Sequence, residues 1–138
     1  MKIRKKIGVV SCSGECCSLG TVSRIATRLI LEELRPNDSV TICLPLFLAG
    51  EEGERSFARE HPTIAVDGCG RLCAKKGIEK HSGKTAGSVD VEAFLKDWGE
   101  QPPASRRDIG EKGFNLANRV AGVVAAKMDA IRKEEIDG

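Results

Sequence analysis

The sequence predicts an α/β protein: a small three-layer domain with a mostly parallel sheet of about four strands and a long C-terminal helix. Two observations support this fold class. Short apolar runs typical of buried strands alternate along the chain with segments whose apolar residues recur at helical spacing. The length of 138 residues, of which 41% are hydrophobic, suffices for one domain with its own core. We therefore expect a single domain over residues 1–138.

Four runs of residues have the character of strands, at 7–12, 39–44, 63–67 and 84–91. The first and the third are short apolar runs that end in small or turn-forming residues, as expected for strands buried on both faces of a parallel sheet. The second run ends beside Pro45, which has no N–H to donate to a sheet. Gly87 lies inside the fourth run and weakens its strand character.

Helices are expected between and after these runs. Apolar residues recur at helical spacing from Leu19 to Leu34, and Pro36 closes that segment. The other expected helices are a short polar one at 53–60, one at 71–81 and a long amphipathic one at about 111–134, after a proline-rich connection at 100–110. Strands that alternate with helices favour right-handed crossovers and helices on both faces of the sheet, as in Rossmann-like and flavodoxin-like domains.

Charge and aromatic content argue against nucleic-acid binding. The chain has 22 basic and 20 acidic residues, a net charge of +2, and only 4% of its residues are aromatic. Nucleic-acid recognition depends on clustered basic residues and on aromatic side chains that stack on bases. We therefore expect no nucleic-acid partner.

The sequence also predicts a cytoplasmic protein without a membrane span. No apolar stretch approaches the roughly 20 residues that a spanning helix needs. The basic start at residues 1–6 resembles the beginning of a signal peptide, but the apolar run that follows, 7–10, is shorter than the about 7–15 residues that a signal peptide requires. In the reducing cytosol cysteines stay as thiols, and clustered cysteines bind metals or carry out redox chemistry.

The cysteines are the unusual feature of the composition, and their positions follow the predicted strands. Two lie at strand ends, two in the loop after the first strand and two after the third strand: Cys12 and Cys43, Cys16 and Cys17, Cys69 and Cys73. The carboxyl ends of parallel strands share one edge of an open sheet, which is where such folds bind ligands. We therefore expect all the cysteines at one edge of the sheet.

Thiolates that converge in this way suit zinc. Cys69 and Cys73 are four residues apart at the start of a predicted helix, and Cys12 and Cys16 have the same spacing. A helix N-terminus lowers the pKa of nearby thiols, which favours thiolates at neutral pH. Four thiolates suit tetrahedral Zn²⁺, with Zn–S distances of about 2.3 Å. Cys43 could instead be a buried hydrophobic side chain, as free cysteines often are.

Several motifs within residues 7–83 occur together in a known family: Cys12-Ser13-Gly14, Gly20, Cys43, Val66-Asp67-Gly68-Cys69 and Cys73. They resemble the DGC-domain family, small proteins regarded as zinc-binding and named for an Asp-Gly-Cys motif. The resemblance implies four chelating cysteines, which map onto Cys12, Cys43, Cys69 and Cys73. Two features differ from the family pattern: the first loop has adjacent cysteines, Cys16 and Cys17, and Gly70 stands where we expect proline in many relatives.

The sequence therefore predicts a metal-binding protein in which Cys12, Cys43, Cys69 and Cys73 hold zinc, with Cys16 or Cys17 replacing one of them. Four thiolates would close the site and tie three strand ends together, whereas three thiolates and an open position would permit Lewis-acid catalysis or metal delivery. Two alternatives use the same residues. A thiol redox or sulfur-carrier enzyme would cycle Cys12, Cys16 and Cys17 through disulfide or persulfide states. An iron–sulfur cluster could also be held by four thiolates.

Other side chains have simpler expected roles. Asp67 would form a turn at its strand end or orient a ligand from outside the metal's own shell. His81 could complete a site of three cysteines and one histidine, although a surface position near a helix end is the simpler expectation, and His61 precedes the third strand, at the opposite edge. A phosphate-binding nucleophile loop would need an arginine six residues after Cys12, where Ser18 stands. The apolar stripe of the last helix predicts core packing, with a homo-oligomer contact as the alternative.

Overall fold

The structure, a computed structural model, describes residues 5–137 and confirms the α/β fold. All strands run parallel in one sheet with the order β2-β1-β3-β4. Their bounds are β1 Ile7–Ser11, β2 Ser39–Val40, β3 Thr63–Asp67 and β4 Gly87–Asp90. The first residues of the basic start, 1–4, lie outside the described residues.

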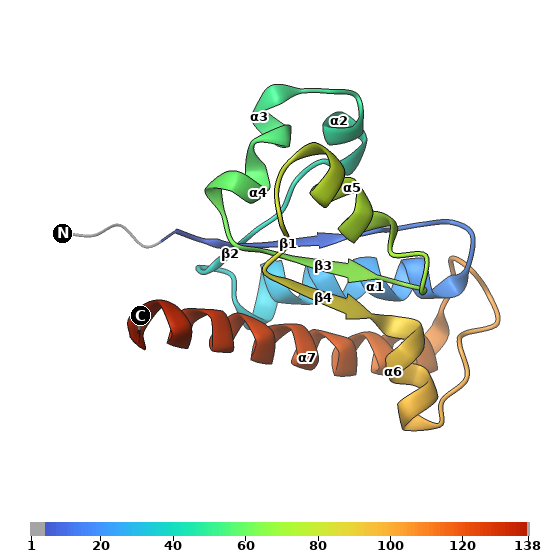
Figure 1. Cartoon of the computed structure of the whole chain (residues 1–138). Helices are drawn as coiled ribbons and strands as arrows, with labels where there is room; N and C mark the ends of the chain where they lie inside the picture. The colour runs from blue at the N-terminus through green and yellow to red at the C-terminus, as the bar shows by residue number, and fades with distance from the viewer. Residues whose placement is uncertain (1–4, 138) are drawn as a thin grey trace.

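Helices cover both faces of the sheet and give the molecule three layers (Figure 1). One face carries α1 (Ser18–Leu29), its π-helical continuation η1 (Ile30–Leu34), and α7 (Gly110–Asp137). The other face carries α2 (Leu44–Leu48), α3 (Glu52–Arg55), α4 (Phe57–Glu60) and α5 (Cys73–His81). The remaining helix, α6 (Val91–Trp98), follows β4 directly. None of the described helices has the length and apolar character that a membrane crossing requires.

Two apolar clusters fill the space between the layers, because successive residues of a strand face opposite sides of the sheet. Ile64 and Val66 of β3 belong to the larger cluster with the buried stripes of α1 and α7, whereas Ala65 between them belongs to the smaller cluster with α5. The apolar stripe of α7, including Val120 and Val124, is buried in this core. A homo-oligomer contact through α7 stays a prediction.

The second strand is shorter than the sequence pattern predicts, and this corrects the place of Cys43. β2 pairs with β1 only at Ser39 and Val40, so residues 41–44 are not part of the sheet. Pro45 stands in the first turn of α2, where its missing N–H costs nothing, and Cys43 is the residue before that helix. The N–H of Cys43 donates to the Glu54 carboxylate, at 3.1 Å, rather than to a strand.

The pattern of the sequence predicts no element at residues 92–99, where the structure has most of α6. The Asp90 carboxylate caps this helix by accepting a hydrogen bond from the Ala93 N–H at 3.3 Å, and Gly99 ends it with a φ of +69°. Both signals are present in the sequence, but a helix of this length buries few side chains and leaves little periodicity. The connection at 100–109 is confirmed, and α7 extends three residues beyond the predicted end at 134, to Asp137.

The strand order determines where a ligand would bind. From β1 the chain crosses to β2 on one side and then to β3 on the other, so neighbouring strands β1 and β3 are followed by segments that leave in opposite directions. The crevice outside the carboxyl ends of two such strands is the usual ligand position in an open α/β sheet. Here that crevice lies between the loop after β1 and the loop after β3.

Candidate metal centre

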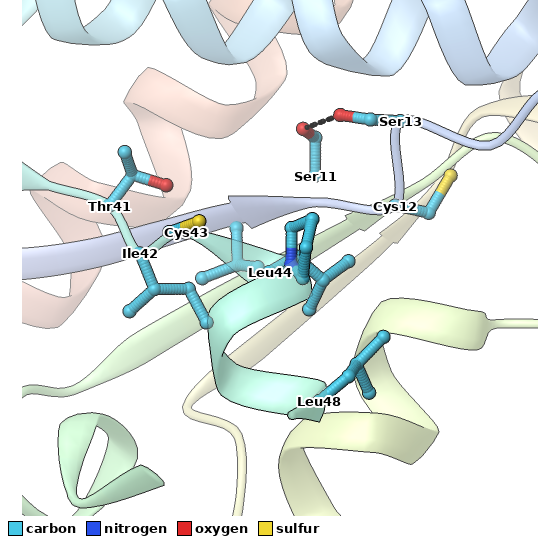
Figure 2. A pocket seen from close by; sticks show the side chains of 10 residues that line it. Ser11, Cys12, Ser13, Thr41, Ile42, Cys43, Leu44 and Leu48 are labelled. Carbon is cyan, nitrogen blue, oxygen red and sulfur yellow. Dashed lines mark hydrogen bonds between the residues drawn. The ribbon is translucent and has the colours of Figure 1, made fainter. Parts of the chain in front are cut away.

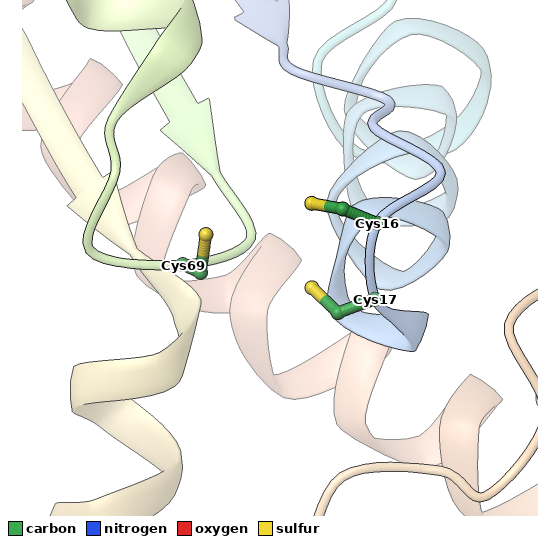
Figure 3. A group of neighbouring side chains, drawn as sticks. All are labelled: Cys16, Cys17 and Cys69. Carbon is green, nitrogen blue, oxygen red and sulfur yellow. The ribbon is translucent and has the colours of Figure 1, made fainter.

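Three thiols face one another across this crevice (Figure 3). Cys16 and Cys17 come from the loop between β1 and α1, and Cys69 comes from the loop between β3 and α5. Their Sγ atoms all lie within 4.8 Å of one another. Four sulfur atoms around a zinc ion lie about 3.8 Å apart when Zn–S is about 2.3 Å and the geometry is tetrahedral. Small side-chain rotations would therefore bring this group to a metal.

The same crevice holds a cavity of about 50 Å³ that is lined by two further cysteines, Cys12 and Cys73, and by Asp67. Pockets for organic ligands start at about 300 Å³, so this cavity has the size for an ion rather than for a metabolite. Five of the six cysteines of the sequence thus share one small cavity at the predicted edge of the sheet.

Cys12 directly follows β1 and lies beside the end of β3. Its backbone N–H continues the pairing of β1 with β3 by donating to the Val66 carbonyl at 3.0 Å. Its Sγ accepts a hydrogen bond from the Gly68 N–H at 3.3 Å and lies 3.6 Å from the hydroxyl of Ser23. The side chain of Cys12 thus joins the end of β1 to the loop after β3.

Two glycines allow the two cysteine loops to pack against the start of α1. A Cβ on Gly68 would lie 2.7 Å from the backbone nitrogen of Gly20 and 2.7 Å from the backbone carbon of Leu19. A Cβ on Gly20 would overlap the backbone of Gly14 in the loop after β1, 2.7 Å from its carbonyl carbon. Since these neighbours are backbone atoms, they cannot rotate away. Glycine at 68 therefore allows the loop of Cys69 to pack against the first turn of α1, and glycine at 20 allows the loop of Cys16 to pack against the same turn.

Asp67 fixes the start of α5. The residue before this helix, Leu72, has a left-handed conformation with a φ of 53° and gives no side-chain cap. The two carboxylate oxygens of Asp67 instead accept hydrogen bonds from the N–H groups of Ala74, at 2.7 Å, and Lys75, at 3.1 Å. Burial raises the pKa of Asp67, and these two hydrogen bonds oppose the rise. Asp67 thus holds the helix turn that carries Cys73.

The pKa of Cys73 is raised, which corrects the expectation of a thiol acidified by a helix N-terminus. Burial is the largest cause, followed by the negative charges of Asp67, Cys12, Cys69 and Cys16. The thiols of this cavity thus repel one another once ionised. A cation among them would reverse the effect, because thiolates that repel one another are all attracted to the same ion.

The loop of Cys16 and Cys17 is held from a distant part of the chain. Arg106, in the connection before α7, donates to the carbonyl of Glu15 at 3.4 Å, and its own carbonyl accepts a hydrogen bond from the Thr21 hydroxyl. Arg107 forms an ion pair with the Glu15 carboxylate at 3.0 Å. A partner this distant in sequence leaves no local pattern, so the sequence alone does not indicate these contacts.

The remaining candidate residues lie elsewhere. Cys43 is exposed and lines a neighbouring cavity, so it is not a buried hydrophobic side chain. His81 ends α5, which begins at Cys73, and one helix of this length separates it from the cysteine cavity by roughly 12 Å. Its ring packs edge-on against Phe47, with ring centroids 6.0 Å apart. The Nδ1 atom of His61 lies 3.0 Å from the carbonyl of Lys6, at the opposite edge of the sheet, as predicted.

The chemistry of the donor set fits a soft or borderline cation such as zinc. Thiolates are the ligands that structural zinc sites prefer, and the residues that line the cavity converge from two rigid loops. The arrangement is compatible with binding of a single metal ion.

Comparison with known proteins identifies a family. No curated protein and no solved structure matched the chain. The family described as the DGC domain matches residues 8–110, which run from β1 to the first residue of α7 and include every cysteine. The matched part contains Asp67, Gly68 and Cys69, whose roles in the loop after β3 are described above. Because the match extends over most of its length, the chain belongs to the DGC-domain family.

Proposed function

We propose that the protein binds one zinc ion through the thiolates of Cys16, Cys17 and Cys69. The observation that carries this proposal is the mutual approach of these three Sγ atoms to within 4.8 Å across the crevice between β1 and β3. Neither loop alone offers a closed metal site, so the ion would join the two loops. Asp67 and Gly68 support it by holding the second loop in place.

The fourth ligand comes from Cys73 or Cys12, which line the same cavity. Cys73 would place the ion at the N-terminal end of α5, whereas Cys12 would place it deeper, against the ends of the two strands. Cys43 is not among the proposed ligands, because it lines the neighbouring cavity and its N–H donates a hydrogen bond to Glu54. A site with four thiolates would be structural, and one with three would keep an open position for catalysis or metal delivery.

The setting of this function is the cytosol. A thiolate site stays available for a metal only where a reducing pool keeps its cysteines from forming disulfides. The adjacent thiols of Cys16 and Cys17 are also the groups on which a redox function would depend, so the same experiment must separate the two functions.

Elemental analysis of the anaerobically purified protein, with a visible spectrum and a count of titratable thiols, tests this proposal. We expect about one zinc per chain, no visible absorbance, and protection of the cavity thiols from titration until a chelator is added. The double variant Cys69→Ser/Cys73→Ser should lose zinc, and Cys43→Ser should retain it. Metal-free protein with freely titrating thiols would support the redox alternative, and a brown protein containing iron would support the iron–sulfur alternative.

A further inference from the structure

A second, larger cavity lies beside the cysteine cavity at the same edge of the sheet (Figure 2). Its volume is about 370 Å³, and it lies between the end of β1 and residues 41–48. Cavities that hold small organic molecules have volumes of about 300–1,000 Å³ and favour the carboxyl edge of open α/β sheets. Cys12 lines both cavities, so a molecule in the larger one would lie next to the wall of the smaller one.

The backbone of β1 offers a donor and an acceptor to this cavity. Amide groups alternate in direction along a strand, and the N–H groups of Gly8 and Cys12 both donate toward the β3 side. The N–H of Ile7 donates toward the β2 side, to the carbonyl of Asp38. By this alternation the N–H and C=O of Ser11 also point to the β2 side. Because β2 pairs only with Ile7 and Gly8, no strand meets Ser11 there within the described residues.

Hydroxyl and aliphatic side chains complete the lining. The hydroxyls of Ser11 and Ser13 lie 2.8 Å apart, and Ser13 has a left-handed backbone with a φ of 51°. In Figure 2 these two serine side chains lie on one side of β1, and Leu48 lies on the other. Thr41 and Ile42 come from the segment that leaves the sheet after β2. The cavity is therefore polar along β1 and aliphatic toward α2.

The charges around this cavity disfavour an anionic ligand. Among the described residues that line the cavity there is no lysine, arginine, histidine, aspartate or glutamate. A carboxylate contacts its wall, because Glu54 accepts a hydrogen bond from the N–H of Cys43. A carboxylate or phosphate ligand would meet no cation and would be repelled by this group.

We propose that this cavity binds a small, uncharged molecule that carries an amide group. The amide C=O accepts a hydrogen bond from the N–H of Ser11, as a carbonyl of β2 would if that strand continued. A short aliphatic portion of the molecule lies against Ile42 and Leu48. This proposal does not depend on metal binding.

Thiol–disulfide exchange at Cys43, which lines the cavity, provides the test. The Cys43 thiolate attacks a symmetrical disulfide, forms a mixed disulfide with one half and releases the other half as a thiolate. Three probes share a two-carbon spacer after the sulfur and differ in the group that it carries: the disulfides of N-acetylcysteamine (neutral amide), cysteamine (cation) and 3-mercaptopropionate (anion). The tryptic peptide 29–55 contains Cys43 as its single cysteine, so mass spectrometry of this peptide measures the adduct whatever state the other cysteines are in.

We expect the N-acetylcysteamine adduct to survive about tenfold more 2-mercaptoethanol than the other two adducts, which is the effect of about one net hydrogen bond. Leu48→Ala should reduce this preference. Leu46→Ala is the matched control, because Leu46 is an exposed leucine of the same helix that does not line the cavity. Equal survival of all three adducts, or equal losses in the two leucine variants, would overturn the proposal. Since the readout is confined to Cys43, absence of zinc from the protein would leave this result unaffected.

Discussion

At the scale of single residues, the Asp-Gly-Cys motif has a separate physical role for each of its members. Asp67 caps α5 with both carboxylate oxygens, Gly68 allows close packing against the backbone of α1, and Cys69 supplies the thiol that faces Cys16 and Cys17. None of the three can take over the role of another. The motif therefore positions the proposed metal centre and also contributes a thiol to it.

Replacement of Gly68 by alanine should separate the two cysteine loops. The new Cβ would lie 2.7 Å from backbone atoms of Leu19 and Gly20, so the loops must move apart. We expect a loss of about 2 kcal/mol in the free energy of unfolding, within the range of overpacking substitutions, together with weaker zinc binding. Urea denaturation and zinc competition with a chelator would measure the two effects.

Gly77→Ala is the matched control for that substitution. Gly77 lies in α5, and a Cβ there would have no other atom within 4 Å. Alanine should therefore stabilise the helix by up to about 1 kcal/mol and leave zinc binding unchanged. Equal stability of Gly68→Ala and wild type would contradict the close packing described for this loop.

The sequence predicts where the cysteines gather better than it predicts the contacts that hold their loops. Cys69 follows a strand of a parallel sheet, and this alone predicts its position at the carboxyl edge. Three contacts could not be inferred from the sequence: the hydrogen bonds that Ala74 and Lys75 donate to Asp67, the packing of Gly68 on α1, and the hydrogen bond from Arg106 to the carbonyl of Glu15. These contacts join residues whose neighbours in space are set by the whole fold, so no local pattern reports them.

At the scale of elements, a buried arginine fastens α7 to the edge of the sheet. The side chain of Arg132 is 7% exposed and bonds to the carboxylates of Asp38 and Glu135 and to the carbonyl of Lys5. Asp38 stands just before β2, whose two paired residues give it little attachment of its own. The ion pair thus joins the shortest strand to the longest helix.

Replacement of Arg132 should lower the free energy of unfolding more than replacement of a comparable exposed arginine. Arg132→Ala leaves partly buried carboxylates without their partner, and we expect a loss of about 3 kcal/mol in the free energy of unfolding. Arg35→Ala is the control, because Arg35 also contacts α7, through Asp129 at 2.8 Å, with side chains that are 33% and 60% exposed. Its loss should be below about 1 kcal/mol. Similar values for both variants in urea denaturation would contradict the role given to Arg132.

The elements themselves show where sequence patterns succeed. β3 agrees with its predicted range, 63–67, because it is buried on both faces and is bounded by Pro62 and Gly68. β2 does not, because residues 41–44 have strand-forming side chains but leave the sheet after Val40 and lead into α2, although β1 continues to Ser11. Local propensity predicts the conformation that a segment favours, whereas an edge strand ends where its neighbour and the following helix require.

At the scale of the whole molecule, the proposed zinc ion would connect the two βα units that meet at the strand switch between β1 and β3. The five cysteines of the cavity come from parts of the chain that are adjacent only after the sheet has formed. Metal binding would then add to the stability of the folded state, because the unfolded chain holds no preformed site.

Removal of the metal should lower the unfolding temperature. Free zinc at 100 times its dissociation constant would add about 2.7 kcal/mol to the free energy of unfolding, less whatever affinity the unfolded thiols retain. Calorimetry with and without a chelator would measure the difference. We expect Cys43→Ser to keep the full effect of the chelator and Cys69→Ser to show little or none. Unfolding of a zinc-loaded protein that does not respond to the chelator would argue against a stabilising metal.

X-ray absorption at the zinc edge tests the central claim most directly, because it counts the atoms bound to the metal. We predict a shell of sulfur alone at about 2.3 Å from zinc in the wild-type protein and in Cys43→Ser. In a triple variant with serine at Cys16, Cys17 and Cys69, we predict loss of bound zinc. A shell dominated by nitrogen or oxygen, or an unchanged sulfur shell in the triple variant, would contradict the proposed centre.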